Sequence, residues 1–168
     1  IYERVEAADQ SAVVKDVAHS YIATLAAMGG KVNLNQAMDI CVRNLFESTS
    51  HGLNHQALGF RVALGQLFLG LDMVKVAEAM LDQVSRDIQR YGCSERTYAA
   101  FLLESGRVVA LQEGRMARAY AIYLRPCFDR ARTRGYFRLA LAAGLEATQC
   151  LQRMREDFGL NDELSEEE

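Results

Sequence analysis

Two histidines, His51 and His55, are spaced as metal ligands often are, because side chains four residues apart share one face of a helix. His51 stands next to Gly52, where a helix is expected to end, so the two rings are not expected to share a face. Glu47 is the nearest acid, and no cysteine is close enough in sequence to supply a third ligand. We therefore interpret the histidines as solvated or helix-capping residues, and we expect no metal and no other cofactor.

The cysteines are the second group with chemical potential. They are Cys41, Cys93, Cys127 and Cys150. Their wide spacing, without a C-x-x-C pair, favours reduced and mostly buried thiols. A reactive thiol needs a base and positive surroundings, and Cys127 has Arg125 and Arg130 nearby but follows Pro126 inside an apolar helix. The chain has no phosphate loop, dinucleotide fingerprint or serine-hydrolase motif. We expect that it is not an enzyme.

Arginine is concentrated in one segment, where only Asp129 opposes it. The arginines are Arg115, Arg118, Arg125, Arg130, Arg132, Arg134 and Arg138. Such a run usually forms a solvated face; the alternative is a basic surface for an acidic partner segment, a phosphopeptide or nucleic acid. The net charge of −3 and the pI near 5.7 argue against a dedicated nucleic-acid binder.

The elements that must position these residues are helices. The 168 residues suit one domain, half of them are hydrophobic, and no apolar run reaches the length of a membrane span. Strand-like alternation is absent, and apolar residues recur at helical spacing. The pattern predicts seven helices, at residues 11–28, 34–48, 54–71, 73–91, 95–113, 116–134 and 136–157.

Glycines and small polar residues mark the expected helix ends. Left-handed C-terminal caps are predicted at Gly29, Gly30, Gly92, Gly114 and Gly135, and N-caps at Asn33, Asp72 and Ser94. Pro126 falls inside a predicted helix and should kink it. Gly65 and Gly70 also fall inside a helix, and they indicate close helix packing.

An internal repeat organises the helices. A small residue, Ala37, Ala77 or Ala119, stands in the second turn of three successive helices, and the spacings are 77−37=40 and 119−77=42 residues. A glycine ends each of these helices, at Gly52, Gly92 and Gly135. Because a helix pair cannot bury its own apolar face, it stacks on a copy of itself, and a small residue at the crossing permits close approach.

The repeat resembles the tetratricopeptide family in two segments. In EGRMARAYAIYLRPCFDRA, Gly114 opens the turn and Ala119 is the small crossing residue. In LGQLFLGLDMVKVAEAMLDQV, Leu64, Gly65 and Phe68 stand in the first helix, and Ala77 and Leu81 in the second. The repeat is longer than the family's usual length of about 34 residues, and no Trp is present. The likeness is therefore to the long-helix variant found in scaffolds and in the sensor arms of bacterial transcription activators.

This resemblance implies an all-α, right-handed superhelix of about three antiparallel helix pairs, closed by a C-terminal capping helix. We expect one domain over residues 1–160 and an acidic, disordered tail over 161–168. In such a stack the first helix of each pair lines a concave groove, which would bind a partner protein or peptide segment. The expected groove residues are His19, Ile22, Ala26, Val62, Gln66, Leu69, Glu104, Val108 and Leu111. The expected electrostatic rim is Arg118, Arg125, Arg130, Arg134 and Arg138.

The leading interpretation of function is a cytoplasmic adaptor or scaffold, nuclear if the source is a eukaryote. Two alternatives stay open: the sensor domain of a transcription activator, which would bind an effector or a repressor protein, and a secretion chaperone. An enclosed pocket with converging polar groups would favour the sensor. An open apolar groove would favour the adaptor or the chaperone.

Overall fold

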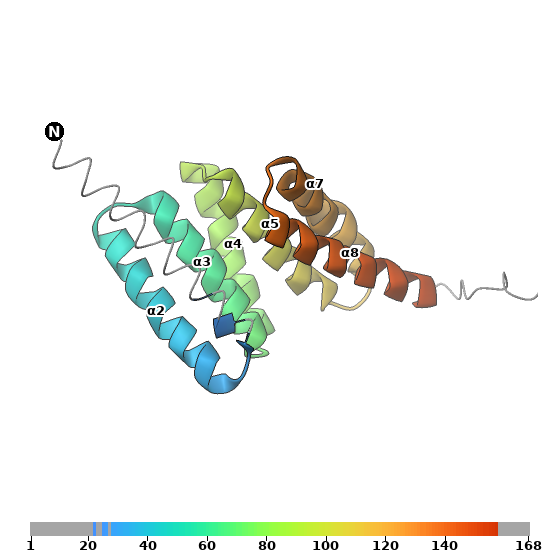
Figure 1. The fold of residues 1–168 in the computed structure, drawn as a ribbon, viewed down its shortest axis with the longest axis horizontal. Helices are drawn as coiled ribbons and strands as arrows, with labels where there is room; N and C mark the ends of the chain where they lie inside the picture. Colours follow the sequence, from blue (N-terminus) through green and yellow to red (C-terminus); the bar gives the residue numbers. More distant parts are fainter. Residues whose placement is uncertain (1–21, 23–24, 27, 158–168) are drawn as a thin grey trace, which may run out of the picture. The chain divides into compact units, whose positions relative to one another are not determined.

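The computed structural model describes residues 22, 25–26 and 28–157, and these residues form helices joined by short turns, with no strand among them (Figure 1). Of the predicted helix over residues 11–28, residues 22, 25, 26 and 28 are described and helical; the rest lies outside the described residues, as does His19. The chain divides into two compact units, unit 1 over residues 1–97 and unit 2 over residues 98–168.

Unit 1 contains α2 (Lys31–Ser50), α3 (Asn54–Gly70) and α4 (Val74–Tyr91), and α3 packs against both of the others (Figure 1). Its core combines large aliphatic and aromatic side chains with two small ones. The buried cluster is Ile22, Leu25, Leu34, Ala37, Cys41, Phe60, Leu64 and Leu67. Between α3 and α4, Arg61 forms an ion pair with Asp87, which Gln83 also contacts.

Two of the three helices of unit 1 end in the same backbone motif. After α2, the N–H of Gly52 donates to the carbonyl of Thr49, and that of Leu53 to the carbonyl of Ser48. This Schellman motif needs a residue at positive φ, and Gly52 has φ 70°. The same motif follows α3, where Asp72 takes the positive φ, at 61°.

The predicted N-caps were therefore mostly wrong. Asp72 belongs to the end of α3, and its side chain does not cap α4. Asn33 lies inside α2 and donates to the carbonyl of Gly29. Ser94 is a true N-cap, since its Oγ accepts the backbone N–H of Thr97 at 3.1 Å. The glycines predicted to be left-handed C-terminal caps all have positive φ, between 64° and 81°: Gly29, Gly30, Gly92, Gly114 and Gly135. Gly92 ends α4 with ψ 177° and Gly30 is the N-cap of α2 with ψ 142°, so these two are not αL caps.

The small residues of the repeat are where helices meet. Ala37, Ala77 and Ala119 are all 0% exposed, as their place at helix crossings predicted. The predicted close packing at Gly65 and Gly70 is also confirmed. A Cβ on Gly65 would lie 3.0 Å from Leu81, and one on Gly70 would lie 3.3 Å from Leu34. The tighter contact, at Gly65, limits how α3 faces α4, whereas the side-chain end of Leu34 can adjust at Gly70.

Unit 2 holds most of α5 (Glu95–Ala110), whose first residues belong to unit 1, followed by α6 (Met116–Arg118), η1 (Ala119–Leu124), α7 (Arg125–Thr133) and α8 (Phe137–Asp157). The predicted helix over 116–134 is thus three segments, of which η1 is π-helical. The N–H of Arg125 donates to the carbonyl of Tyr120, five residues back. Pro126 has no N–H to continue the α-helical ladder, and a widened turn lies directly before it. The kink expected at this proline stays a prediction.

A glycine of α5 gives a direct test of the packing in unit 2. A Cβ on Gly106 would lie 2.6 Å from Leu124 Cδ2 and 3.1 Å from Tyr123 Cβ. We expect Gly106→Ala to reduce the free energy of unfolding by about 1–3 kcal/mol, because neither neighbour can move without shifting η1. Urea denaturation followed by circular dichroism measures the change. Gly70→Ala is the matched control: its Cβ would meet only the flexible end of Leu34, so it should be near neutral. An equal effect of both substitutions would contradict the close α5–η1 crossing.

Candidate protein-binding surface

A buried ion cluster attaches α8 to α5. Arg107 donates from Nε to Glu146 of α8 at 2.8 Å, and from Nη1 to Glu104 of its own helix at 3.0 and 3.3 Å. One guanidinium therefore serves two carboxylates, and its fork geometry matches this arrangement. Because Glu104 is only 4% exposed, the cluster is sensitive to the angle at which α8 lies on α5.

Burial dominates the ionisation of this cluster. Loss of solvent raises the pKa of Glu104, and the nearby Glu146 raises it further, against the opposing effect of Arg107. Burial lowers the pKa of Arg107, but the two carboxylates together raise it by more, so the guanidinium is always charged. Arg107 is therefore the permanent cation that holds the cluster together. Glu104 is the member of the cluster for which the charged form is least favourable.

Further contacts fix α7 and α8 within unit 2. Cys127 Sγ donates to the carbonyl of Ala99 on α5 at 3.1 Å. On α8, a Cβ at Gly144 would lie 3.3 Å from the ring of Phe128, which shows how closely α7 and α8 approach. These contacts leave α8 little freedom to rotate about its axis, so its outward face is well defined.

The outward face of α8 is apolar where it begins. The inward face carries small side chains, and Ala140, Ala143 and Cys150 are buried. Three of the large apolar residues point the other way, while Leu139 is half-buried: Phe137 is 79% exposed, Leu141 76% and Leu145 58%. These three residues recur every fourth position and form a row along the helix, which we call the α8 ridge. A helix of a lone domain normally turns its large apolar residues inward.

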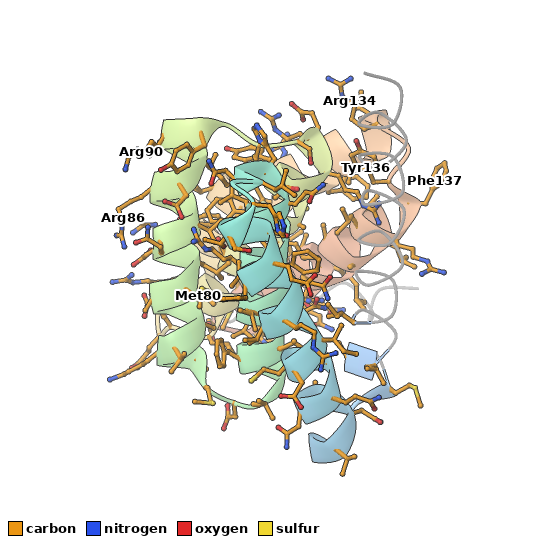
Figure 2. All side chains as sticks on the ribbon, turned by 90° about the vertical axis from the view of Figure 1, so that its left-hand side faces the viewer. Met80, Arg86, Arg90, Arg134, Tyr136 and Phe137 are labelled. Atoms are coloured by element: carbon orange, nitrogen blue, oxygen red, sulfur yellow. The ribbon has the colours of Figure 1, made fainter. Side chains whose placement is uncertain are left out.

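Arginines stand beside the α8 ridge. Arg134 is the residue at which α7 ends, and Arg138 lies in the first turn of α8; both are exposed. A Schellman motif joins the two helices, with Gly135 at φ 74° and the N–H of Tyr136 donating to the carbonyl of Ala131. Arg134 and Phe137 point away from the ribbon at this junction (Figure 2). Both a cation and an aromatic ring are therefore exposed at this turn.

The residues predicted to line a groove differ widely in exposure. Val62, Glu104 and Val108 are buried at 4%, 4% and 3% exposure, and Ile22 is buried at 1%. Gln66, Leu69 and Ala26 are half-buried, and Leu111 is 60% exposed. That these predicted groove residues contact a partner stays a prediction. Burial does not favour it for Val62 and Val108, and Glu104 is already engaged by Arg107.

The predicted rim arginines are exposed: Arg118, Arg125, Arg130, Arg134 and Arg138. Arg130 has a structural contact, since its guanidinium lies 5.0 Å from the centre of the Tyr98 ring and links α7 to α5. Arg134 and Arg138 lie in sequence next to the α8 ridge. We therefore regard these two as the members of the predicted rim best placed to act with an apolar surface.

Sequence reasoning missed the α8 ridge, although a signal was present. The segment FRLALAAGLEA carries apolar residues on every side, more than one buried face can use. We had expected α8 to be a capping helix, and a cap needs a polar outer face. The exposed Phe137, Leu141 and Leu145 contradict that role for the beginning of the helix.

The residues first considered for chemistry have structural surroundings. His51 ends α2, and its Nδ1 donates to the carbonyl of Glu47 at 2.7 Å, which is the capping role we predicted. Burial raises the pKa of Cys41 to about 12 and that of Cys127 to about 11.

Across the described part of the chain, no group of three or more His, Cys, Asp or Glu is arranged to hold a metal ion. None of its helices combines the length and apolar character needed to cross a bilayer.

The ion cluster predicts a dependence of stability on pH. Glu104 has a folded pKa above its ordinary value of 4.5, so its contribution to stability is present in full below that value and is lost as the pH rises through the folded pKa. We expect Glu104→Gln to flatten the fall in melting temperature above this pH. The amide keeps a hydrogen-bond acceptor for Arg107, which retains Glu146 as its counter-ion. Melting curves across a pH series, with Glu113→Gln on the surface as the control, measure the difference. Parallel curves for the wild type and Glu104→Gln would contradict the raised pKa.

Comparisons with known proteins do not indicate what this surface binds. Neither a protein-family model, a curated protein nor a solved structure matches this chain. Its function must therefore be argued from burial, charge and packing, and within unit 2 these distinguish the α8 ridge and its two arginines.

Proposed function

We propose that this chain is a protein-binding helical-repeat module of the adaptor or scaffold type, and that the α8 ridge is a principal contact surface. One observation carries the proposal: α8 directs small residues inward and three large apolar residues, Phe137, Leu141 and Leu145, outward. Exposed apolar rows rimmed by charged residues are typical of sites where another protein binds.

The energetic argument follows from the exposed area. Fully burying a side chain such as Leu or Phe contributes about 1.5–3 kcal/mol relative to leaving it in water. When the chain is alone, the three side chains of the α8 ridge do not gain most of this stabilisation, because they stay in contact with water. A partner that covers the ridge would recover it, and aromatic and aliphatic anchors of this kind commonly dominate binding energy.

The buried polar groups support a binding role over a catalytic or effector-sensing one. A pocket for a small molecule needs a few polar groups that converge without partners of their own. Here Asp87 is paired with Arg61, and Glu104 with Arg107. Among the described side chains, Ser48 Oγ is the buried polar atom with no hydrogen-bond partner, and one hydroxyl is not a converging set.

A comparison of two exposed leucines tests both the function and its location. Leu141→Glu places a charge in the α8 ridge, whereas Leu111→Glu places one in the predicted groove; both leucines are largely exposed, so both variants should fold. Each tagged variant is used for affinity capture from extract of the native source, followed by quantitative mass spectrometry. We expect the same proteins to be retained by the wild type and Leu111→Glu, and lost about tenfold or more with Leu141→Glu.

The other outcomes have definite meanings. Loss with Leu111→Glu alone would place binding in the predicted groove and refute the α8 ridge. Retention by all three proteins would exclude both surfaces. If the wild type retained nothing above a tag-only control, the adaptor function itself would be contradicted.

A further inference from the structure

We infer that the occupant of the α8 ridge is an amphipathic helix of another protein, with acidic residues, glutamate above all, flanking its apolar stripe. This inference rests on the proposed function and adds the chemistry of the partner. It is drawn from the shape of the ridge, from the charges beside it, and from the poor fit of a second copy of this chain.

The shape of the α8 ridge suits a helix. Phe137, Leu141 and Leu145 follow the row of every fourth residue, and this row spans about 12 Å of α8, given 1.5 Å per residue. Rows of this kind pack into the groove between side-chain rows of a second helix. An extended strand would instead need a sheet edge with free backbone groups, and the backbone groups of α8 are used within the helix.

The charges beside the ridge have one sign. Residues 130–145 contain Arg130, Arg132, Arg134 and Arg138 and no acidic residue. Glu146 comes next, but its carboxylate is engaged by Arg107. Beyond the ridge, the exposed residues Thr148 and Gln152 are uncharged. An acidic partner therefore meets complementary charge where the apolar row begins, at Arg134 and Arg138, whereas a basic one meets repulsion there.

A second copy of the chain does not satisfy both the apolar and the charged residues. In an antiparallel pair centred on Leu141, Phe137 would pack beside the second copy's Leu145, but Arg134 would face the second copy's Thr148. Shifting the register so that Arg138 meets the second copy's Glu156 places Leu141 against the second copy's Arg153. Because neither of these registers matches both properties, the sequence of α8 is better suited to a different partner.

The size of the ridge agrees with a single bound helix. Standard interfaces between folded proteins bury roughly 800 Å² on each partner. Three side chains and two arginines offer much less, which is enough to hold two or three turns of a helix. The flanking arginines would then act mainly on the association rate and its salt dependence, while the apolar residues act on dissociation.

Designed peptides test this chemistry on the full chain. The probe is a fluorescent helical peptide of about 20 residues, long enough to form a helix, with leucines at every third or fourth position and glutamates beside them. A matched peptide replaces each glutamate with lysine. Fluorescence anisotropy is measured at low and at physiological salt. We expect the glutamate peptide to bind about tenfold or more tightly than the lysine peptide at low salt, and salt to narrow this preference.

Variants of the protein locate the binding. Leu141→Glu should weaken binding of the glutamate peptide about tenfold or more, and Leu151→Glu, at an exposed leucine about 15 Å further along α8, should have a smaller effect. The double variant Arg134→Glu/Arg138→Glu should reverse the preference, so that the lysine peptide binds more tightly. Circular dichroism confirms that each variant is folded. Because the arginine variants leave the apolar row intact, the reversal is specific to charge.

Three results would overturn the inference. Equal affinity of the protein for the two peptides would show that the arginines do not select an acidic partner. Binding unaffected by Leu141→Glu would place the peptide elsewhere. A dimer detected by analytical ultracentrifugation and abolished by Leu141→Glu would make a second copy the occupant. If neither peptide binds, but Leu141→Glu still abolishes the affinity capture of native partners, the proposed function stands. Only the acidic helix as the occupant is then wrong.

Discussion

Close approach of helices at small residues is the constraint on which the rest of this structure depends. Where two helices cross at an alanine or a glycine, no other residue fits, and the orientation of each helix about its axis is fixed. In unit 1 Gly65 lies against Leu81 of α4, and in unit 2 Gly106 lies against Leu124 and Tyr123 of η1, while Ala77 and Ala119 are fully buried. On α8 the close approach of Gly144 to Phe128 turns a small-residue face toward α7, and Phe137, Leu141 and Leu145 are left on the outer face.

The buried ion pairs add specificity more than stability. A buried pair loses hydration about as large as its Coulomb attraction, so its net contribution is small, but a wrong pairing is strongly unfavourable. Arg61 and Asp87 select how α3 faces α4. Arg107, shared between α5 and α8, selects one rotation of α8 and therefore determines which side chains reach the surface. The charged cluster and the apolar ridge are in this sense two consequences of one helix orientation.

The sequence predicts the local features of this fold better than its surface. Helical periodicity and the positive-φ glycines gave the helix class and most helix ends, because both depend on residues near in sequence. Asp72 was misassigned, since aspartate serves both N-caps and left-handed positions and only the hydrogen bonds distinguish them. The groove set included Val62 and Val108, because family register gives the side of a helix but not how completely neighbours cover it. The α8 ridge was missed because an apolar helix is ordinarily a buried one.

The large size of the ridge residues also constrains how a partner helix can sit. Small residues bring helix axes to about 8 Å, and large ones hold them near 10 Å. Phe137 and Leu141 therefore keep a partner helix at the wider separation. At that distance a cation must be long to reach across, which suits the guanidinium of Arg138. The acid on the partner must be long as well, and for this reason glutamate fits the proposed interface better than aspartate. The side chains that exclude close approach thus also determine which charged residues can complete the contact.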